Sequence, residues 1–160
     1  AGSVSSKKIS QIDLNQWYKL IDDNLTSTFL VTKFSFPLFA KYGNRSIVNI
    51  SSIAGQRFSK TAGVHYTSTK AGLIGFTKQL AVEKAKYKIR INCIAPGQID
   101  SKMLDKAIKN SKNRKNKLIN AIPLKRLART EDIVNVCEFL CSEKSSYLTG
   151  TIIDVNGGVI

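Results

Sequence analysis

The sequence has little of what metal sites, disulfide frameworks and membrane spans require. Its 160 residues contain one histidine, His65, and three cysteines, Cys93, Cys137 and Cys141. A single histidine leaves too few ligands for a metal site, and an odd number of cysteines within apolar segments favours small buried side chains over disulfides. No apolar run approaches the ~20 residues of a membrane span, and the first residues lack a signal-peptide core. We therefore expect a cytoplasmic protein that uses no metal and contacts no membrane.

Acidic residues are scarce as well. Eleven Asp and Glu stand against 25 Lys and Arg, a net charge of +14, and ten of the basic residues fall between Lys102 and Arg129, where Asp105 is the one acid. A basic surface suits an acidic carrier protein, a phosphorylated substrate or nucleic acid. Compositional bias remains an alternative, because Lys, Ile and Asn make up 48 of the 160 residues. Since the basic run has no aromatic residue to stack on bases, we expect no nucleic-acid partner.

A chain of this length can form one domain with a substantial core. Apolar residues recur at three- and four-residue spacing over 14–42, which predicts one long helix or two in tandem. The polar cluster Asp22-Asp23-Asn24 would disturb the backbone ladder of this helix, Pro37 would kink its last turns, and Gly43 would end it. Residues 1–13 are expected to be a loop.

The middle of the chain predicts a strand, a helix and a second strand. The strands are Ser46–Ser51 and Ile89–Ala95, the second stopped by Pro96-Gly97, and the helix between them is Val64–Lys86. At this spacing they form a βαβ unit, so the sheet is expected to be parallel and the class α/β.

The last third is harder to interpret. Residues 101–120 are polar, basic and weakly helical, and they suit a mobile flap over a site better than a core element. Thr130 fits the N-cap of a further helix with acidic residues in its first turn. Thr151–Val155 is then the last strand. Three strands are few for a doubly wound sheet.

Tyr66 and Lys70 draw attention because residues four apart on a helix are surface neighbours. A nearby ammonium favours the phenolate and would lower the pKa of the phenol, which makes an acid–base pair. With five tyrosines and 19 lysines in the chain, chance can supply such a pair. Its position is more informative, since the strand Ile47–Ile50 just before it ends in Ser51-Ser52, and open α/β sheets bind ligands beyond the carboxyl ends of their strands.

Taken together, these motifs resemble the later part of a short-chain dehydrogenase/reductase. The matching motifs are Ala1-Gly2 (the tail of Asn-Asn-Ala-Gly), Asn24 (the helix asparagine), Ile47–Ser52 (the serine strand), Tyr66 and Lys70 (Tyr-x-x-x-Lys), Asn92–Gly97 (the strand ending in Pro-Gly) and Gly157-Gly158. The resemblance implies one partial domain over residues 1–160. Its fold would be α/β, a Rossmann-like doubly wound parallel sheet that is incomplete because its first strands and helices are absent.

The resemblance also implies roles for individual residues. Tyr66 would exchange a proton with the substrate oxygen, Ser52 would polarise that oxygen, Lys70 would lower the pKa of the phenol and bind the nicotinamide ribose, and Asn24 would hold a water. The implied cofactor is NAD or NADP, with NADPH favoured, and its contacts would be Tyr66, Lys70, Pro96, Gly97, Ile99 and Ser101.

Three departures from the family pattern bear on these roles. Ser52 lies 14 residues before Tyr66, one more than expected, which suggests an insertion within Gln56–Val64 and leaves Ser51 as a fallback. Lys88 stands where relatives often have the glycine that ends the tyrosine helix. The Gly-rich turn Thr-Gly-x-x-x-Gly-x-Gly that holds the cofactor pyrophosphate is absent. We therefore expect a C-terminal fragment of a longer reductase.

Within the family, residues 122–133 and 147–150 look most like 3-oxoacyl-acyl-carrier-protein reductases of fatty-acid synthesis. Sugar, alcohol and hydroxysteroid dehydrogenases share this block, and an inactive remnant or interaction module is the alternative from another class. The expected partners are a small-molecule or acyl-thioester substrate and an acidic acyl carrier protein, which would dock on Lys84, Lys86, Lys88 or the flap lysines. A homo-oligomer packed through helices 14–42 and 64–86 is also expected.

Overall fold

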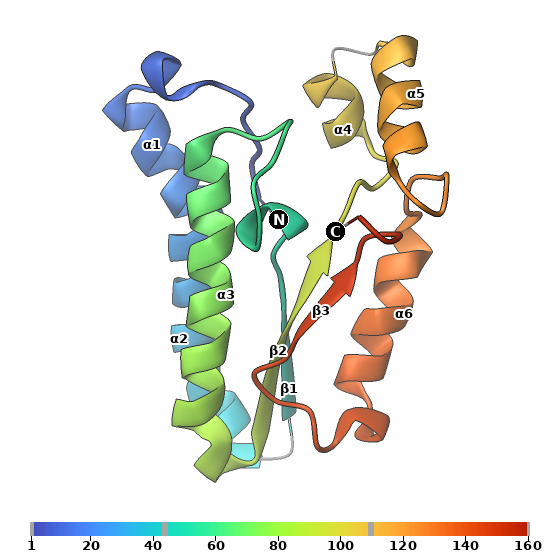
Figure 1. Ribbon diagram of the computed structural model, residues 1–160. Coiled ribbons are helices and arrows are strands. Elements are labelled where there is room, and N and C mark those ends of the chain that lie inside the picture. Colours follow the sequence, from blue (N-terminus) through green and yellow to red (C-terminus); the bar gives the residue numbers. More distant parts are fainter. Residues whose placement is uncertain (1, 43–44, 109–110, 160) are drawn as a thin grey trace.

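A parallel sheet of three strands forms the centre of the molecule, as the computed structural model in Figure 1 shows; the residues it describes are 2–42, 45–108 and 111–159. The strands are β1 (Arg45–Ile50), β2 (Ile89–Pro96) and β3 (Ile152–Val155). Their order is β1-β2-β3, and both pairings are parallel. The α/β class and the incomplete Rossmann-like sheet predicted from the sequence are thereby confirmed.

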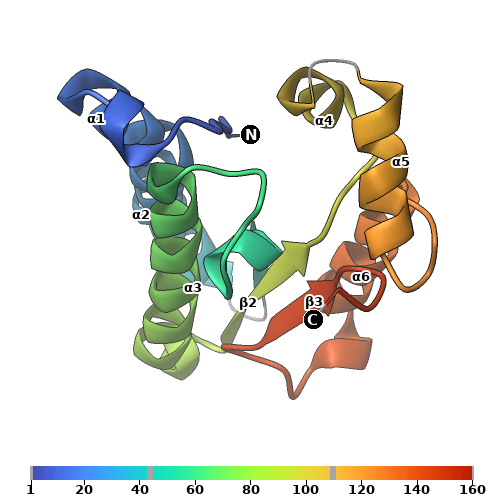
Figure 2. The same ribbon diagram turned by 45° about the horizontal axis from the view of Figure 1, so that its top comes forward.

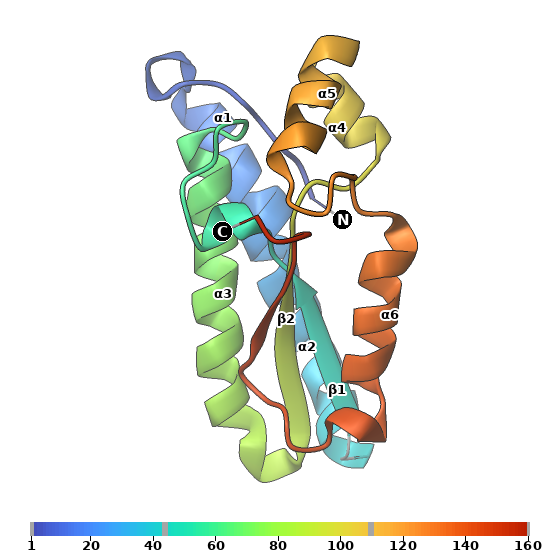
Figure 3. The same cartoon turned by 45° about the vertical axis from the view of Figure 1, so that its right-hand side comes forward.

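Helices cover both faces of this sheet. They are α1 (Leu14–Ile21), α2 (Ser27–Tyr42), α3 (Val64–Lys84), α4 (Lys102–Ala107), α5 (Lys112–Ala121) and α6 (Thr130–Cys141). Figures 1 and 3 place α2 and α3 on one face and α6 on the other. The central strand β2 is therefore shielded on both sides, and every residue from Ile91 to Pro96 is buried, which fits its mostly apolar sequence. Short 3-10 turns lie at Ile9–Gln11, Ile53–Gly55, Ala85–Tyr87 and Glu143–Ser145.

The disturbance predicted at Asp22-Asp23-Asn24 is a π-helical turn. It spans Asp22–Thr26 and separates α1 from α2, so the long apolar stretch forms helices in tandem. Such turns often mark functional sites, because they leave one residue out of the regular hydrogen-bond ladder. Helix α2 continues through Pro37 to Tyr42, while the predicted end at Gly43 lies outside the described residues.

The flap contributes more packed apolar side chains than the sequence indicates. We use this name for α4 and α5, which form a small apolar core together with the segments that follow them. Its buried members are Leu104, Ile108, Ile122 and Leu127, with Leu118, Ile119 and Val159 packed against them. The expectation that this region suits a flap better than a core element is wrong in this respect, because its few apolar residues converge on the end of the chain.

Two other expectations are corrected. Helix α6 begins at Thr130 with Arg129 as its N-cap residue, and the capping oxygen belongs to Asp132, which accepts the Arg129 N–H at 2.7 Å. The Arg126 guanidinium also binds Asp132 and holds the pKa of that carboxyl at about 2. Among the cysteines, Cys93 is buried as predicted, but Cys141 is exposed, because α6 faces the protein interior through the neighbouring, fully buried Leu140.

Lys88 occupies the left-handed region, with φ 56°, at the turn between α3 and β2. A residue with a side chain destabilises the folded state by about 1–2 kcal/mol in this backbone conformation. Glycine avoids that strain, but its greater freedom stabilises the unfolded state by about 0.4–1 kcal/mol. Lys88→Gly is therefore expected to raise the free energy of unfolding by about 0.5–1 kcal/mol. Chemical denaturation measures this, with Lys86→Gly, in the preceding 3-10 turn, as a control that should lower stability. A loss for Lys88→Gly would contradict the prediction.

Within the described ranges, no helix combines the length and the apolar character needed to cross a membrane.

Candidate active site

A pocket of about 630 Å³ opens at the carboxyl ends of β1 and β2. Its walls come from the N-terminal segment, the loop of residues 53–62, the start of α3, the end of β2, the flap and the end of the chain. Figures 1 and 2 show the flap beyond the strand ends, across from the loop that precedes α3. All eight residues that the sequence singled out line this pocket: Asn24, Ser52, Tyr66, Lys70, Pro96, Gly97, Ile99 and Ser101.

Ser52 lies just beyond β1, where its hydroxyl caps a 3-10 turn by accepting the Ala54 N–H at 3.1 Å. The same hydroxyl lies near enough to the Tyr66 phenol to lower its pKa. The hydroxyl of Ser51 is instead buried and donates to the Lys70 carbonyl at 2.8 Å. Of the two serines, Ser52 is therefore the one with a hydroxyl directed to the tyrosine.

The loop that follows Ser52 lies directly on helix α3. A Cβ added to Gly55 would stand 2.6 Å from the Lys70 carbonyl carbon, a contact that the backbone atoms cannot relieve. Glycine at this position therefore allows the serine turn to approach the turn of α3 that carries Lys70. The insertion suggested within Gln56–Val64 stays a prediction.

Tyr66 and Lys70 lie on one face of α3, with the Lys70 Nζ 5.7 Å from the centre of the Tyr66 ring. Lys70 is 8% exposed, and its ammonium donates to the Ile50 carbonyl at 3.0 Å. Burial lowers the pKa of Lys70, although the nearby Cys93 opposes that shift. Burial also raises the pKa of Tyr66, against a smaller opposite effect of the Ser52 hydroxyl. Lys70 is not among the groups that shift this pKa, so the lowering predicted from the sequence is not found.

Asn24 is buried in the π-helical turn, and its side chain is bonded to the N-terminal segment. Its Oδ1 accepts the Ser3 N–H at 3.0 Å, and its Nδ2 donates to the Ser3 carbonyl at 2.9 Å. A Cβ on Gly2 would lie 2.4 Å from the same Oδ1, so the segment passes closely over the asparagine. The sequence did not suggest this anchoring role, because the partners are 21 residues apart. Water binding by Asn24 stays a prediction.

The segment after β2 presents backbone groups to the pocket. Gln98 accepts the Ala128 N–H, and Asp100 donates its own N–H to Ala128, each at 2.9 Å. Successive peptide groups of an extended chain point in opposite directions, so the N–H and C=O of Ile99 face away from Ala128. The Ser101 hydroxyl caps α4 by accepting the Leu104 N–H at 3.2 Å.

Sequence reasoning missed the side chains that complete the pocket. The apolar ones are Phe58, Met103, Leu104, Leu118, Ile122 and Val159. Arg57, Lys60 and Lys70 supply positive charge, and none of the described residues that line the pocket is acidic. An apolar cavity with this charge balance favours an uncharged or anionic ligand with an apolar part. These residues come from four separate segments, so no local motif could have identified them.

The residues present fit the nicotinamide half of a dinucleotide. Tyr66, Lys70 and the backbone at Ile99 lie on one cavity and offer a phenol, an ammonium and amide groups. The pyrophosphate half has no counterpart, since the sequence contains no glycine-rich phosphate turn. Among the described residues, no three His, Cys, Asp or Glu side chains gather as metal ligands.

Comparisons with known proteins agree with this geometry. A family model described as enoyl-(acyl carrier protein) reductase matches residues 1–160. A 3-oxoacyl-[acyl-carrier-protein] reductase from Aquifex aeolicus is 44% identical over 99% of this chain and 62% of its own length. An acetoacetyl-CoA reductase from Cupriavidus necator is 41% identical over 98% of this chain and 61% of its own length.

Solved structures give the same result. The crystal structure of a 3-oxoacyl-[acyl-carrier protein] reductase with bound NAD from Brucella melitensis superimposes with a TM-score of 0.86 at 33% identity, over 99% of this chain and 59% of that one. The chain thus spans about 60% of the length of these relatives. Because the family model matches it from its first residue to its last, the chain belongs to the short-chain dehydrogenase/reductase family.

Proposed function

We propose that this chain is the catalytic part of an NAD(P)-dependent reductase that converts 3-oxoacyl thioesters to 3-hydroxyacyl thioesters. One observation carries the proposal: Ser52, Tyr66 and Lys70 share a pocket with an apolar wall and no carboxylate. Such a wall suits an acyl chain better than a sugar, whose hydroxyls need polar partners. The names of the relatives from Aquifex aeolicus and Cupriavidus necator agree with a thioester substrate.

The reaction adds a hydride to the substrate carbonyl carbon and a proton to its oxygen. A nicotinamide cofactor supplies the hydride when bound, NADPH being favoured by the family resemblance. Ser52 would donate a hydrogen bond to the carbonyl oxygen and hold it beside the phenol. Tyr66 would transfer its proton to that oxygen as negative charge develops. Lys70, Pro96, Gly97, Ile99 and Ser101 would hold the nicotinamide and its ribose, and Asn24 would bind the water that connects Lys70 to solvent.

The raised pKa of Tyr66 suits the direction of reduction. A phenol that titrates above its ordinary value of 10.0 keeps its proton at neutral pH and can donate it. Oxidation of the alcohol needs the phenolate, so we expect the oxidation rate to rise with pH toward that pKa while the reduction rate does not.

An acidic acyl carrier protein is the proposed source of the thioester. Lys102, Lys106, Lys112, Arg114 and Lys117 are exposed on the flap, whose inner residues line the pocket. Among the alternative docking residues, Lys84 follows Tyr66 by 18 residues, about 27 Å along α3, and Lys86 and Lys88 lie beyond the end of that helix. A carrier that delivers its acyl chain to Tyr66 is therefore better placed on the flap.

We also propose a homo-oligomer that buries the outer side of α2. Phe29, Leu30, Val31, Phe34, Leu38 and Tyr42 are all exposed there. Contiguous exposed apolar side chains of this kind mark interaction surfaces. Analytical ultracentrifugation of Phe34→Lys against Lys144→Glu, an exposed lysine in the 3-10 turn after α6, tests this, since only the first should dissociate the assembly.

The function is tested with a chimera that restores the missing part. The N-terminal region of the Aquifex aeolicus reductase is joined to residues 1–160 of this chain, and NADPH oxidation is followed with acetoacetyl thioester, glucose and secondary alcohols. Reduction of the thioester is expected. Turnover confined to glucose or the alcohols would refute the acyl substrate. A folded chimera with no turnover on any of them would favour an inactive remnant.

The 160-residue chain alone is expected not to bind a dinucleotide, because it lacks the phosphate turn that supplies much of the attraction for the cofactor. Fluorescence titration with NADPH should show no saturation in the micromolar range, whereas the chimera should saturate. Saturable binding by the chain alone would contradict this prediction.

A further inference from the structure

Arg57 links two walls of the pocket that are distant in sequence. It follows the serine turn, and its guanidinium reaches the end of the chain, where Nη1 donates to the Val159 carbonyl at 2.6 Å. Its Nη2 lies 3.4 Å from the Asp154 carboxylate, and its side chain is 22% exposed. The bond to Val159 is the shorter of the two contacts, and charged donors form stronger hydrogen bonds than neutral ones.

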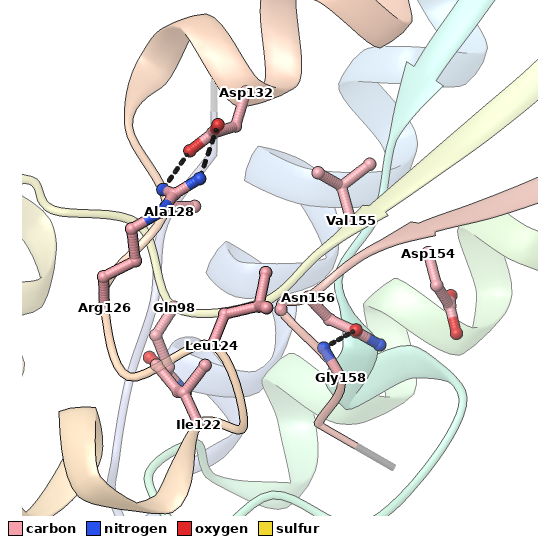
Figure 4. A pocket seen from close by; sticks show the side chains of 11 residues that line it. Gln98, Ile122, Leu124, Arg126, Ala128, Asp132, Asp154, Val155, Asn156 and Gly158 are labelled. Carbon is pink, nitrogen blue, oxygen red and sulfur yellow. Dashed lines mark hydrogen bonds and ion pairs between the residues drawn. The ribbon is translucent and has the colours of Figure 1, made fainter.

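The segment that Arg57 holds is itself tightly built. We call Asn156–Val159 the tail. Its two glycines have positive φ angles, 65° at Gly157 and 88° at Gly158. The Asn156 side chain accepts the Gly158 N–H at 2.9 Å and donates to the Val159 carbonyl at 3.0 Å. Figure 4 shows the first of these bonds beside Ile122 and Leu124. The tail is thus a closed turn that presents the Val159 carbonyl to Arg57.

The tail in turn contacts the segment that follows the flap. The Gly157 carbonyl accepts the Leu124 N–H at 3.1 Å, and a Cβ on Gly157 would stand 2.8 Å from Ile122 Cγ2. The Val159 side chain packs into the small core beneath α4 and α5. A movement of the flap away from the pocket would therefore displace the tail and the carbonyl that Arg57 binds.

We propose that Arg57 is a positioning residue that couples the flap to the loop carrying Ser52. Through the Val159 carbonyl it fixes the apolar wall formed by the flap relative to the wall formed by Ser52 and Tyr66. This role rests on the reductase proposed above. In that enzyme, the distance between the two walls determines where an acyl chain lies when its carbonyl is beside Tyr66. Arg57 need not touch the reacting atoms.

The coupling itself is tested without any turnover, by hydrogen–deuterium exchange on the 160-residue chain. Arg57→Met keeps an apolar stem but removes the donor, and it should speed exchange of the Leu124 amide and of the α4 and α5 amides about tenfold. The amide of Cys93, in the central strand, should be unchanged. Arg57→Lys should restore part of the protection.

Two controls separate this coupling from loss of charge. Lys60→Met removes a cation from the same loop and should leave the exchange rates of the flap amides unchanged. Asp154→Asn removes the ion pair but keeps the Val159 bond, so its effect should be much smaller than that of Arg57→Met. Unchanged flap exchange in Arg57→Met would overturn the proposal, and so would equal acceleration in the flap and the central sheet.

The chimera gives a second measurement. Arg57→Met should raise the KM for acyl thioesters several-fold and leave kcat within about twofold, with Arg57→Lys intermediate. A several-fold fall in kcat without a change in KM would overturn the positioning role. A chimera without activity would count against the proposed reductase, whereas the exchange result would still decide the coupling.

Discussion

Replacement of Tyr66 by phenylalanine in the chimera is expected to lower kcat for acetoacetyl thioester by about 10²- to 10⁴-fold. The phenol lies beside both Ser52 and Lys70, and phenylalanine keeps its ring and shape. KM should therefore change little, since the lost interaction belongs to the transition state. Steady-state NADPH oxidation measures both constants.

The matched control is Tyr147→Phe. Tyr147 is fully exposed, so the same chemical change there should leave kcat and KM as they are. A Tyr66→Phe chimera that retains more than a tenth of the activity would show that Tyr66 is not the proton donor. A large increase in KM at constant kcat would assign it to binding instead.

Lys70→Met is expected to make the chain more stable and the chimera inactive. The ammonium is buried, and no carboxylate lines its pocket. Burial lowers the pKa of Lys70 from its ordinary 10.5, so the unfolded chain holds this proton more tightly than the folded chain does. The folded state consequently loses stability at neutral pH, and the loss diminishes as the pH rises toward 10.5. Methionine removes this cost while preserving most of the length of the side chain.

The thermal midpoint of Lys70→Met should rise by about 2–4 °C at neutral pH. The gain should shrink near the ordinary lysine pKa, where the unfolded wild-type chain also begins to lose its proton. Lys60→Met, which removes an exposed lysine from the same pocket, serves as the control and should leave the midpoint unchanged. A lower midpoint for Lys70→Met would mean that the hydrogen bond to the Ile50 carbonyl outweighs the cost of burial.

Local patterns predicted much of this site. The spacing of Tyr66 and Lys70 and the serines that end β1 were sufficient to bring those residues to one pocket, because a βαβ unit fixes which strand ends meet. The position of the π-helical turn followed from a polar cluster in an apolar helix. The polar cluster did not predict that the turn is π-helical. Asn24 is bonded to Ser3, and helical periodicity does not encode that contact.

The missed features depend on contacts that are remote in sequence. Arg57 and Val159 are 102 residues apart, and the apolar core of the flap forms only when the tail returns to it. The position of Thr130 suggested a capping hydroxyl, but the Asp132 carboxylate can reach back to both Arg126 and Arg129 and takes its place. Burial of Tyr66 likewise could not be inferred from the residue four positions away.

The strand order has a practical consequence for handling this chain. Within the described residues β1 pairs with β2 alone, so its other side exposes main-chain groups that can template a strand from a second molecule. The net charge of +14 should keep such molecules apart by mutual repulsion at low ionic strength. Added salt screens that repulsion over a distance of about 10 Å at 0.1 M. Light scattering of the isolated chain is therefore expected to increase as salt is added, and a low-salt buffer is the condition in which it should remain dispersed.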